Sequence, residues 1–93
     1  MSVVILGGNE CMVRQYKDLC KEFQCSAKVI SKMTGTLKNR LGSPDLLVMF
    51  TDTISHKMVK CAMSEIKGQN PAIARSKSSS MAALRNILET HAV

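Results

Sequence analysis

The sequence predicts a small α/β domain with a four-stranded parallel sheet and helices on both faces. Short apolar runs alternate along the chain with longer segments whose apolar residues recur at helical spacing. The most hydrophobic runs are continuously apolar, which is typical of strands buried on both faces. Strands that alternate with helices imply right-handed crossovers and therefore parallel neighbours.

The first strand is predicted at residues 3–6, and it ends at Gly7 and Gly8. Asn9 can cap the helix that follows, with Glu10 in its first turn against the positive end of the helix dipole. The apolar stripe of this helix consists of Met12, Tyr16, Leu19, Cys20 and Phe23.

The second strand is predicted at residues 27–30 and the third at residues 45–50. Between them lies a polar stretch, residues 34–42, in which Leu37 and Leu41 are one helical turn apart. We expect a short helix there, ended by the glycine that closes the stretch.

After the third strand, Ser55 and His56 lead into a helix that Gly68 ends. The fourth strand is predicted at residues 71–74, and residues 75–80 form the loop before the last helix. The apolar stripes of these two helices are Met58, Val59, Ala62, Met63 and Ile66, and then Leu84, Ile87, Leu88 and His91. The natural spatial order of four such strands is 2-1-3-4, as in a small flavodoxin-like sheet or half of a Rossmann-like fold.

The composition is that of one globular domain, residues 1–93, with 45% hydrophobic and 22% charged residues. A chain this short has a thin core, so a homodimer would add stability. The net charge of +6 suggests an anionic partner, but the basic residues are spread along the chain and aromatic residues are 3%. Because base stacking needs aromatic side chains, this pattern argues against nucleic acid and favours a small anion.

A cytoplasmic location is expected. Residues 1–8 lack the charged start of a signal peptide, and no apolar stretch has membrane-spanning length. The four cysteines, Cys11, Cys20, Cys25 and Cys61, form no C-x-x-C motif and are expected to be free thiols.

A sheet of this order binds ligands outside the carboxyl ends of its strands, near the switch point between strands one and three. The residues that the sequence places there are the predicted ligand contacts. They are Gly7, Gly8, Asn9, Thr51, Ser55, His56, Arg75, Ser78, Ser79 and Ser80.

The segment from Arg75 to Ser80 is best suited to an anion. Serine hydroxyls and the free amides of a helix start donate hydrogen bonds, and an arginine adds a bidentate donor. The alternative is that the serines serve only as caps and turn residues.

The glycine turn does not complete a nucleotide motif. Gly7, Gly8 and Asn9 lack the remaining glycine of G-x-G-x-x-G, and Lys32 follows the second strand where an acid would hold a ribose. The glycines serve either a tight turn or the close approach of a bound group.

Two further residues could carry chemistry. His56 lies in the first turn of a helix, where the dipole favours the neutral imidazole that accepts a proton or ligates a metal. Its alternative role is that of a cap or surface group. Cys11, near a helix start, could act as a nucleophile with Asp52 and His56 if their loops converge, although free cysteines usually pack inertly.

The chain resembles the bacterial family known as domain of unknown function 2325 over nearly its whole length. The resemblance lies in V-V-I-L-G-G from residue 3 to 8, the pair Ser55-His56, and R-S-K-S-S-S-M-A-A-L from residue 75 to 84. It implies an α/β domain and no established reaction. The matching polar positions are Gly8, Ser55, His56, Arg75, Ser78, Ser79 and Ser80, while Asn9 stands where relatives often have arginine.

Three functions follow as hypotheses. The first is a ligand-binding or sensory module for a small anion, and it is favoured over an enzyme. The second is a haem-binding dimer with His56 as the axial ligand and Arg75 near a propionate. The third is a thiol-dependent enzyme that uses Cys11 with His56.

Overall fold

Four parallel strands form the centre of the molecule in the order β2-β1-β3-β4. The computed structural model describes residues 1–30, 44–66 and 71–91. The strands are β1 (Ser2–Leu6), β2 (Ser26–Ile30), β3 (Leu46–Phe50) and β4 (Ala72–Ser76). The predicted fold class and strand order are confirmed. The predicted helix at 34–42, Lys32 and the stop at Gly68 lie outside the described residues.

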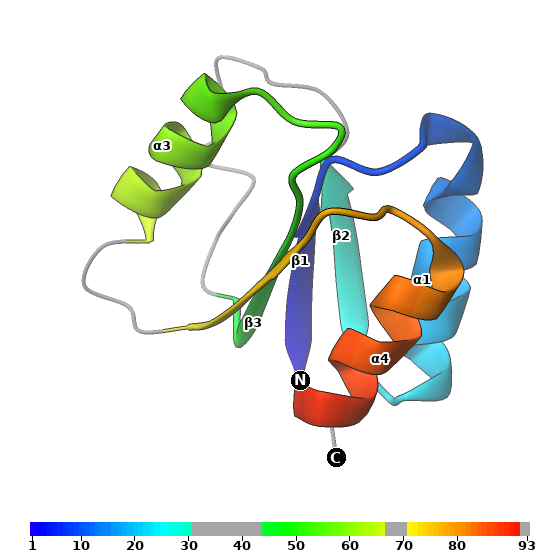
Figure 1. Ribbon diagram of the computed structural model, residues 1–93. Coiled ribbons are helices and arrows are strands. Elements are labelled where there is room, and N and C mark those ends of the chain that lie inside the picture. Colours follow the sequence, from blue (N-terminus) through cyan, green and yellow to red (C-terminus); the bar gives the residue numbers. More distant parts are fainter. Residues whose placement is uncertain (31–43, 67–70, 92–93) are drawn as a thin grey trace.

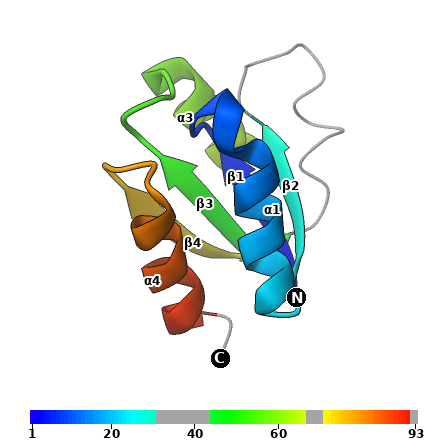
Figure 2. The same cartoon turned by 90° about the vertical axis from the view of Figure 1, so that its right-hand side faces the viewer.

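Helices cover both faces of the sheet. A 3-10 turn, η1 (Glu10–Met12), leads into α1 (Val13–Glu22), and the later helices are α3 (His56–Glu65) and α4 (Met81–His91). Helices α1 and α4 lie side by side on one face and α3 lies on the other (Figure 1). The side view shows α1 and α4 in front of the sheet with α3 behind it (Figure 2).

Each face of the sheet has its own apolar cluster because strand residues alternate between the faces. Val3 and Ile5 of β1 pack with the buried side chains of α1 and α4, whereas Val4 and Leu6 pack with those of α3. All five residues of the central strand β3 are buried. This explains the continuous apolar run that the sequence shows at β3.

Strand β4 extends further than predicted, which changes the position of Arg75. The strand was expected to end at Ala74, but it continues to Ser76 and begins after Pro71. The added residues pair with the end of β3, Arg75 opposite Met49 and Ser76 opposite Phe50. Arg75 and Ser76 therefore belong to the strand, and their side chains point to opposite faces of the sheet.

Two other expectations differ in detail. Asn9 caps η1 and not α1, since its side chain accepts a hydrogen bond from the Cys11 amide. His91 is exposed, because it is the last residue of α4, while Leu84 and Leu88 of the same helix are fully buried. None of the helices in the described ranges has the length and apolar character that a membrane crossing requires.

Candidate functional site

Three connecting segments gather where the strands end, at the upper end of the sheet in Figure 1. They are residues 7–9 after β1, residues 51–55 after β3 and residues 77–80 after β4. We call this region the carboxyl-end edge. Because the strands are parallel, every predicted contact residue lies at this edge or in the element that borders it.

The two glycines of the first segment are required by packing within the protein. Both have positive φ, +85° for Gly7 and +91° for Gly8. A Cβ at Gly7 would lie 2.5 Å from Ile54 Cγ2, and one at Gly8 would lie 2.7 Å from Tyr16 Cε2. A side chain at either position would therefore clash with the protein's own atoms, which is the requirement of a tight turn.

The amides of this first segment are also used internally. The Gly7 amide donates to the Ile30 carbonyl at 2.8 Å, which extends the ladder between β1 and β2. The Gly8 amide donates to Thr53 Oγ1 at 2.7 Å, and the Asn9 amide donates to Tyr16 Oη at 3.2 Å. The segment therefore supports the edge and offers few free donors to a ligand.

Tyr16 joins two of the segments, a role that sequence reasoning missed. Its side chain is fully buried, with its ring centroid 5.5 Å from that of Phe50. Its hydroxyl accepts from the Asn9 amide and donates to the Ser79 carbonyl at 2.6 Å. The only signal for this role was that the chain's one tyrosine occupies a core stripe, where its hydroxyl needs a partner.

The last residue of β4 and the four residues after it form a compact hydrogen-bonded turn, which we call the serine segment (residues 76–80). Ser76 Oγ donates to the Ser78 carbonyl at 2.8 Å and accepts from the Ser78 amide at 3.1 Å. Ser78 Oγ donates to Ser80 Oγ at 3.1 Å, and Ser80 Oγ accepts from the Ala83 amide as the cap of α4. Ser76 and Ser78 therefore stabilise the turn, and Ser80 caps the helix.

Donors remain at this helix start after those bonds are counted. Among the described residues, the amides of Ser79, Met81 and Ala82 have no acceptor. Met81 and Ala82 belong to the first turn of an 11-residue helix, whose dipole places positive charge at this end, and Ser79 directly precedes the capping residue Ser80. Free amides and a positive helix end are the features that bind anions in proteins.

An acidic side chain borders the serine segment. Asp52 Oδ2 accepts a hydrogen bond from Ser79 Oγ at 3.3 Å. Thr51 binds the same segment from its other end, because its amide donates to the Ser76 carbonyl at 2.8 Å. The segments after β3 and β4 are therefore tied together, and Asp52 is a second residue that the list of predicted contacts did not contain.

Arg75 and His56 lie on the other side of the sheet from the serine segment. Arg75 is exposed on edge strand β4, on the α3 face with Met49, and its guanidinium has no ion pair within the described part of the chain. His56 is exposed at the start of α3, where Ser55 caps the helix by accepting from the Met58 amide. The edge thus has two regions, separated by the sheet.

The residues of the thiol hypothesis are not joined. Cys11 is exposed in η1, and Asp52 binds Ser79, so no hydrogen bond links Cys11, Asp52 and His56 in the ranges that the structure describes. A nucleophile and its base need such a bond. In the same ranges, no group of three metal-binding side chains is present, and His56 is a single exposed imidazole.

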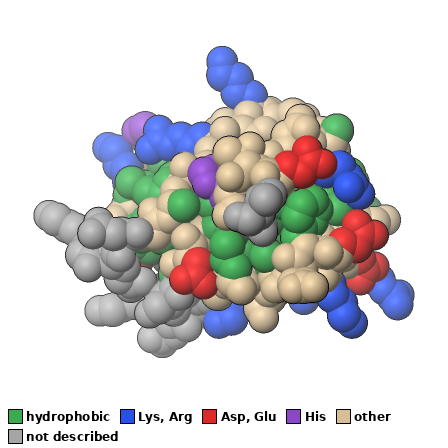
Figure 3. Space-filling model, turned by 90° about the horizontal axis from the view of Figure 1, so that it is seen from below, with side chains coloured by type: hydrophobic (Ala, Val, Ile, Leu, Met, Phe, Trp, Pro, Cys, Tyr) green, Lys and Arg blue, Asp and Glu red, His purple; other side chains and the backbone are tan. Residues whose placement is uncertain are grey.

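Among the residues that the structure describes, the basic side chains are not gathered on the opposite edge. Figure 3 views the amino ends of the strands, and the Lys and Arg side chains drawn in blue lie dispersed around the outline of that face.

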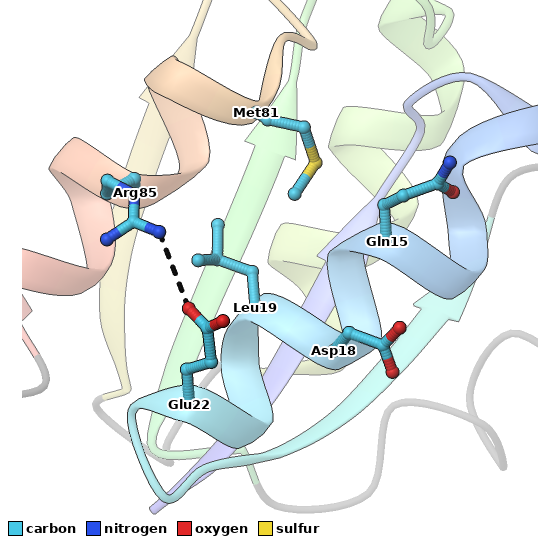
Figure 4. Close-up of a pocket in the computed structure, with 6 residues that line it drawn as sticks. All are labelled: Gln15, Asp18, Leu19, Glu22, Met81 and Arg85. Carbon is cyan, nitrogen blue, oxygen red and sulfur yellow. Dashed lines mark hydrogen bonds and ion pairs between the residues drawn. The ribbon is translucent and has the colours of Figure 1, made fainter.

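A shallow hollow of about 220 Å³ lies between α1 and α4, on the face of the sheet that these two helices cover (Figure 4). None of the predicted contacts lines it. Its lining residues are Gln15, Asp18, Leu19, Glu22, Met81 and Arg85, with Arg85 Nη2 3.4 Å from Glu22 Oε2.

Comparison with known proteins gives one result. The sequence model of the family described as "Uncharacterized protein conserved in bacteria (DUF2325)" matches residues 2–91. The resemblance expected from the sequence is therefore confirmed over nearly the whole chain. No curated protein and no solved structure matches the chain.

Proposed function

We propose a binding function for this chain, which belongs to the uncharacterized bacterial family DUF2325. The ligand is a small anion, such as a phosphate or carboxylate compound, held by the serine segment at the amino terminus of α4. The observation that carries the proposal is the set of three amides, those of Ser79, Met81 and Ala82, which have no acceptor among the described residues.

The geometry of the helix start supports an anionic group there. Backbone amides at the first turn of a helix cannot bond within it, and they converge on the space beyond the helix end. The hydroxyls of Ser78 and Ser80 border the same turn and can reorient to donate to a ligand. Several such donors, each contributing a modest amount, can together replace the hydration of an anion.

Nearby cations add attraction without direct contact. Lys77 lies within the serine segment and Arg75 directly precedes it, and both are exposed. Because Arg75 points to the opposite face of the sheet, we expect it to act through its electric field. The net charge of +6 acts in the same direction and raises the rate at which anions arrive.

Asp52 narrows the class of ligand. Its carboxylate is bound to Ser79 and repels an anion at the neighbouring amides. That repulsion is reduced if the ligand also carries a hydroxyl or amine that donates to Asp52. The preferred ligand therefore has an anionic group for the helix start and a hydrogen-bond donor beside it.

A single substitution can remove one ligand donor without breaking the helix. Met81 is the first residue of α4, and proline is tolerated there because its missing amide hydrogen is not used within the helix. Met81→Pro deletes the amide donor, and Met81→Ala is the matched control that loses the same side chain but keeps the amide. We expect Met81→Pro to weaken binding of inorganic phosphate roughly tenfold or more, as loss of a hydrogen bond to a charged group does.

Nuclear magnetic resonance provides the measurement. Titration of the wild-type chain with inorganic phosphate is expected to shift the amide signals of Ser79, Met81 and Ala82 more than those at the amino ends of the strands. A phosphorylated compound with a free hydroxyl should bind more tightly than phosphate. Equal affinity of Met81→Pro and Met81→Ala for phosphate, or shifts confined to other surfaces, would overturn the proposal.

A further inference from the structure

Two cysteines close the carboxyl end of α1. The chain leaves this helix through a turn in which the Cys25 amide donates to the Cys20 carbonyl and the Gln24 amide donates to the Lys21 carbonyl, both at 2.9 Å. Gln24 has the positive φ of 58° that such a turn requires. This pair of bonds defines a Schellman cap, with Cys20 in the last turn of the helix and Cys25 just beyond it.

The cap places Cys20 and Cys25 next to each other. A contact between the side chains at these two positions frequently accompanies a Schellman cap. Here both belong to the same buried cluster, with Cys20 fully buried and Cys25 7% exposed. A direct bond between the carbonyl of one residue and the amide of the other keeps their Cα atoms within the separations that disulfides bridge, roughly 4.4–6.8 Å.

We propose that Cys20 and Cys25 form a redox-active dithiol, which a low-molecular-weight disulfide oxidises to an intramolecular disulfide. The site lies at the amino end of β2, since β2 starts at Ser26. It is thus at the opposite end of the sheet from the serine segment, and the inference does not depend on the proposed anion site.

The reaction proceeds in two exchanges. The thiolate of Cys25 attacks one sulfur of the small disulfide, its S–S bond breaks, and one small thiolate leaves and takes up a proton. Cys20 then loses its proton to water and attacks the sulfur of Cys25, which expels the second small thiol. Two protein thiols are oxidised, and one small disulfide is reduced to two thiols.

Cys25 acts first because it is the more accessible residue of the pair, at 7% exposed against 0% for Cys20. Burial, together with the nearby Cys25, raises the pKa of the Cys20 thiol from 9.0 to about 11. A thiol with so high a pKa is rarely ionised near neutral pH and reacts slowly with an external disulfide. Once Cys25 is in a mixed disulfide, however, Cys20 is held next to its target.

The other two cysteines are not positioned to compete. Cys11 is exposed in η1, before the opposite end of α1. Cys61 is on α3 and packs against the cluster on the other face of the sheet. The structure therefore singles out one pair of the four cysteines.

Peptide mapping tests the pair in the folded chain. The wild-type chain and a Cys11→Ser/Cys61→Ser variant are treated with oxidised glutathione in native buffer, alkylated with iodoacetamide and digested with trypsin. Cleavage after Lys17, Lys21 and Lys28 separates Cys20 from Cys25. We expect peptides 18–21 and 22–28 to stay joined with the loss of two hydrogen atoms, and dithiothreitol to separate them.

Single variants test the order of attack. With Cys20→Ala, the reaction should stop at a mixed disulfide between glutathione and Cys25. With Cys25→Ser, Cys20 should gain little glutathione in the same time. Recovery of both cysteines as alkylated thiols from the folded wild-type chain, or a link that forms only in guanidinium chloride, would show that the cap is not a redox site. Circular dichroism verifies that each sample is folded.

Discussion

The hydroxyl of Tyr16 donates a 2.6 Å hydrogen bond to the carbonyl of Ser79, a residue 63 positions further along the chain. The same oxygen accepts from the Asn9 amide. A fully buried side chain of α1 therefore fixes both the glycine turn and the serine segment. If the serine segment binds a ligand, its shape depends on this hydroxyl.

Tyr16→Phe tests this dependence. The substitution keeps the ring against Phe50 and removes the hydroxyl's hydrogen bonds to the Asn9 amide and the Ser79 carbonyl, together with its long bond to the Met12 sulfur. The Ser79 carbonyl and the Asn9 amide then lack a hydrogen-bond partner. We therefore expect the free energy of unfolding to fall by about 1–3 kcal/mol. Urea denaturation measures the change. Under the proposed function, phosphate affinity should fall as well.

Ser76→Ala is the control for Tyr16→Phe. Ser76 Oγ bonds only within the serine segment, so its loss should cost less than about 1 kcal/mol. If Tyr16→Phe is no more destabilising than this control, Tyr16 does not hold the edge together.

Most of the fold was predictable because it depends on local pattern. Continuous apolar runs predicted β1 and β3, and alternation with helical segments predicted the parallel order that the structure has. The end of β4 was not predictable in this way. Arg75 and Ser76 are polar, and they join the strand because Met49 and Phe50 of β3 lie opposite them. The Thr51 amide, directly after β3, also donates to the Ser76 carbonyl.

The candidate site was less predictable than the fold. Parallel topology alone places Gly8, His56 and Ser79 at one edge. Tertiary hydrogen bonds decide which backbone amides remain free to bind a ligand, and the bond from the Gly8 amide to Thr53 is one example. The alternation of side chains along β4 decides which face of the sheet Arg75 occupies, and it separates Arg75 from the serine segment. These depend on three-dimensional contacts that spacing along the chain does not encode.

Gln24→Gly is expected to stabilise the protein. Gln24 adopts a φ of 58° in the cap of α1, a conformation that costs residues with a Cβ roughly 1–2 kcal/mol and that glycine adopts freely. Part of this gain is offset by the greater freedom of glycine in the unfolded chain. We therefore expect the free energy of unfolding to rise by about 0.5–1 kcal/mol, measured by urea denaturation. Gln24→Ala, which keeps a Cβ, is the control and should give no such gain.

Asp52→Asn is expected to strengthen phosphate binding. The change removes a negative charge that lies next to Ser79 while it keeps an oxygen that can accept from the hydroxyl. At low ionic strength we expect the affinity for inorganic phosphate to rise a few-fold, by roughly the 1 kcal/mol of an exposed charge pair, and the gain to shrink with added salt. Calorimetric titration at two salt concentrations measures both effects. Unchanged affinity at low salt would place the anion away from this segment.

Stability should fall at alkaline pH through Cys20. Its thiol has a pKa of about 11 in the folded protein against 9.0 as the ordinary value, because burial disfavours the thiolate. Between these pH values the unfolded state has lost the proton and the folded state keeps it, so the unfolded state binds fewer protons and stability decreases as pH rises. This loss of stability is absent below pH 9. Between pH 9 and about 11 it amounts to at most roughly 1.4 kcal/mol per pH unit. Urea denaturation of wild type and Cys20→Ala across this window isolates the effect of the Cys20 thiol, because the two chains share every other titratable group. The alanine chain is expected to be less stable at neutral pH and to lose less stability as pH rises, and parallel pH profiles for the two chains would contradict a buried Cys20.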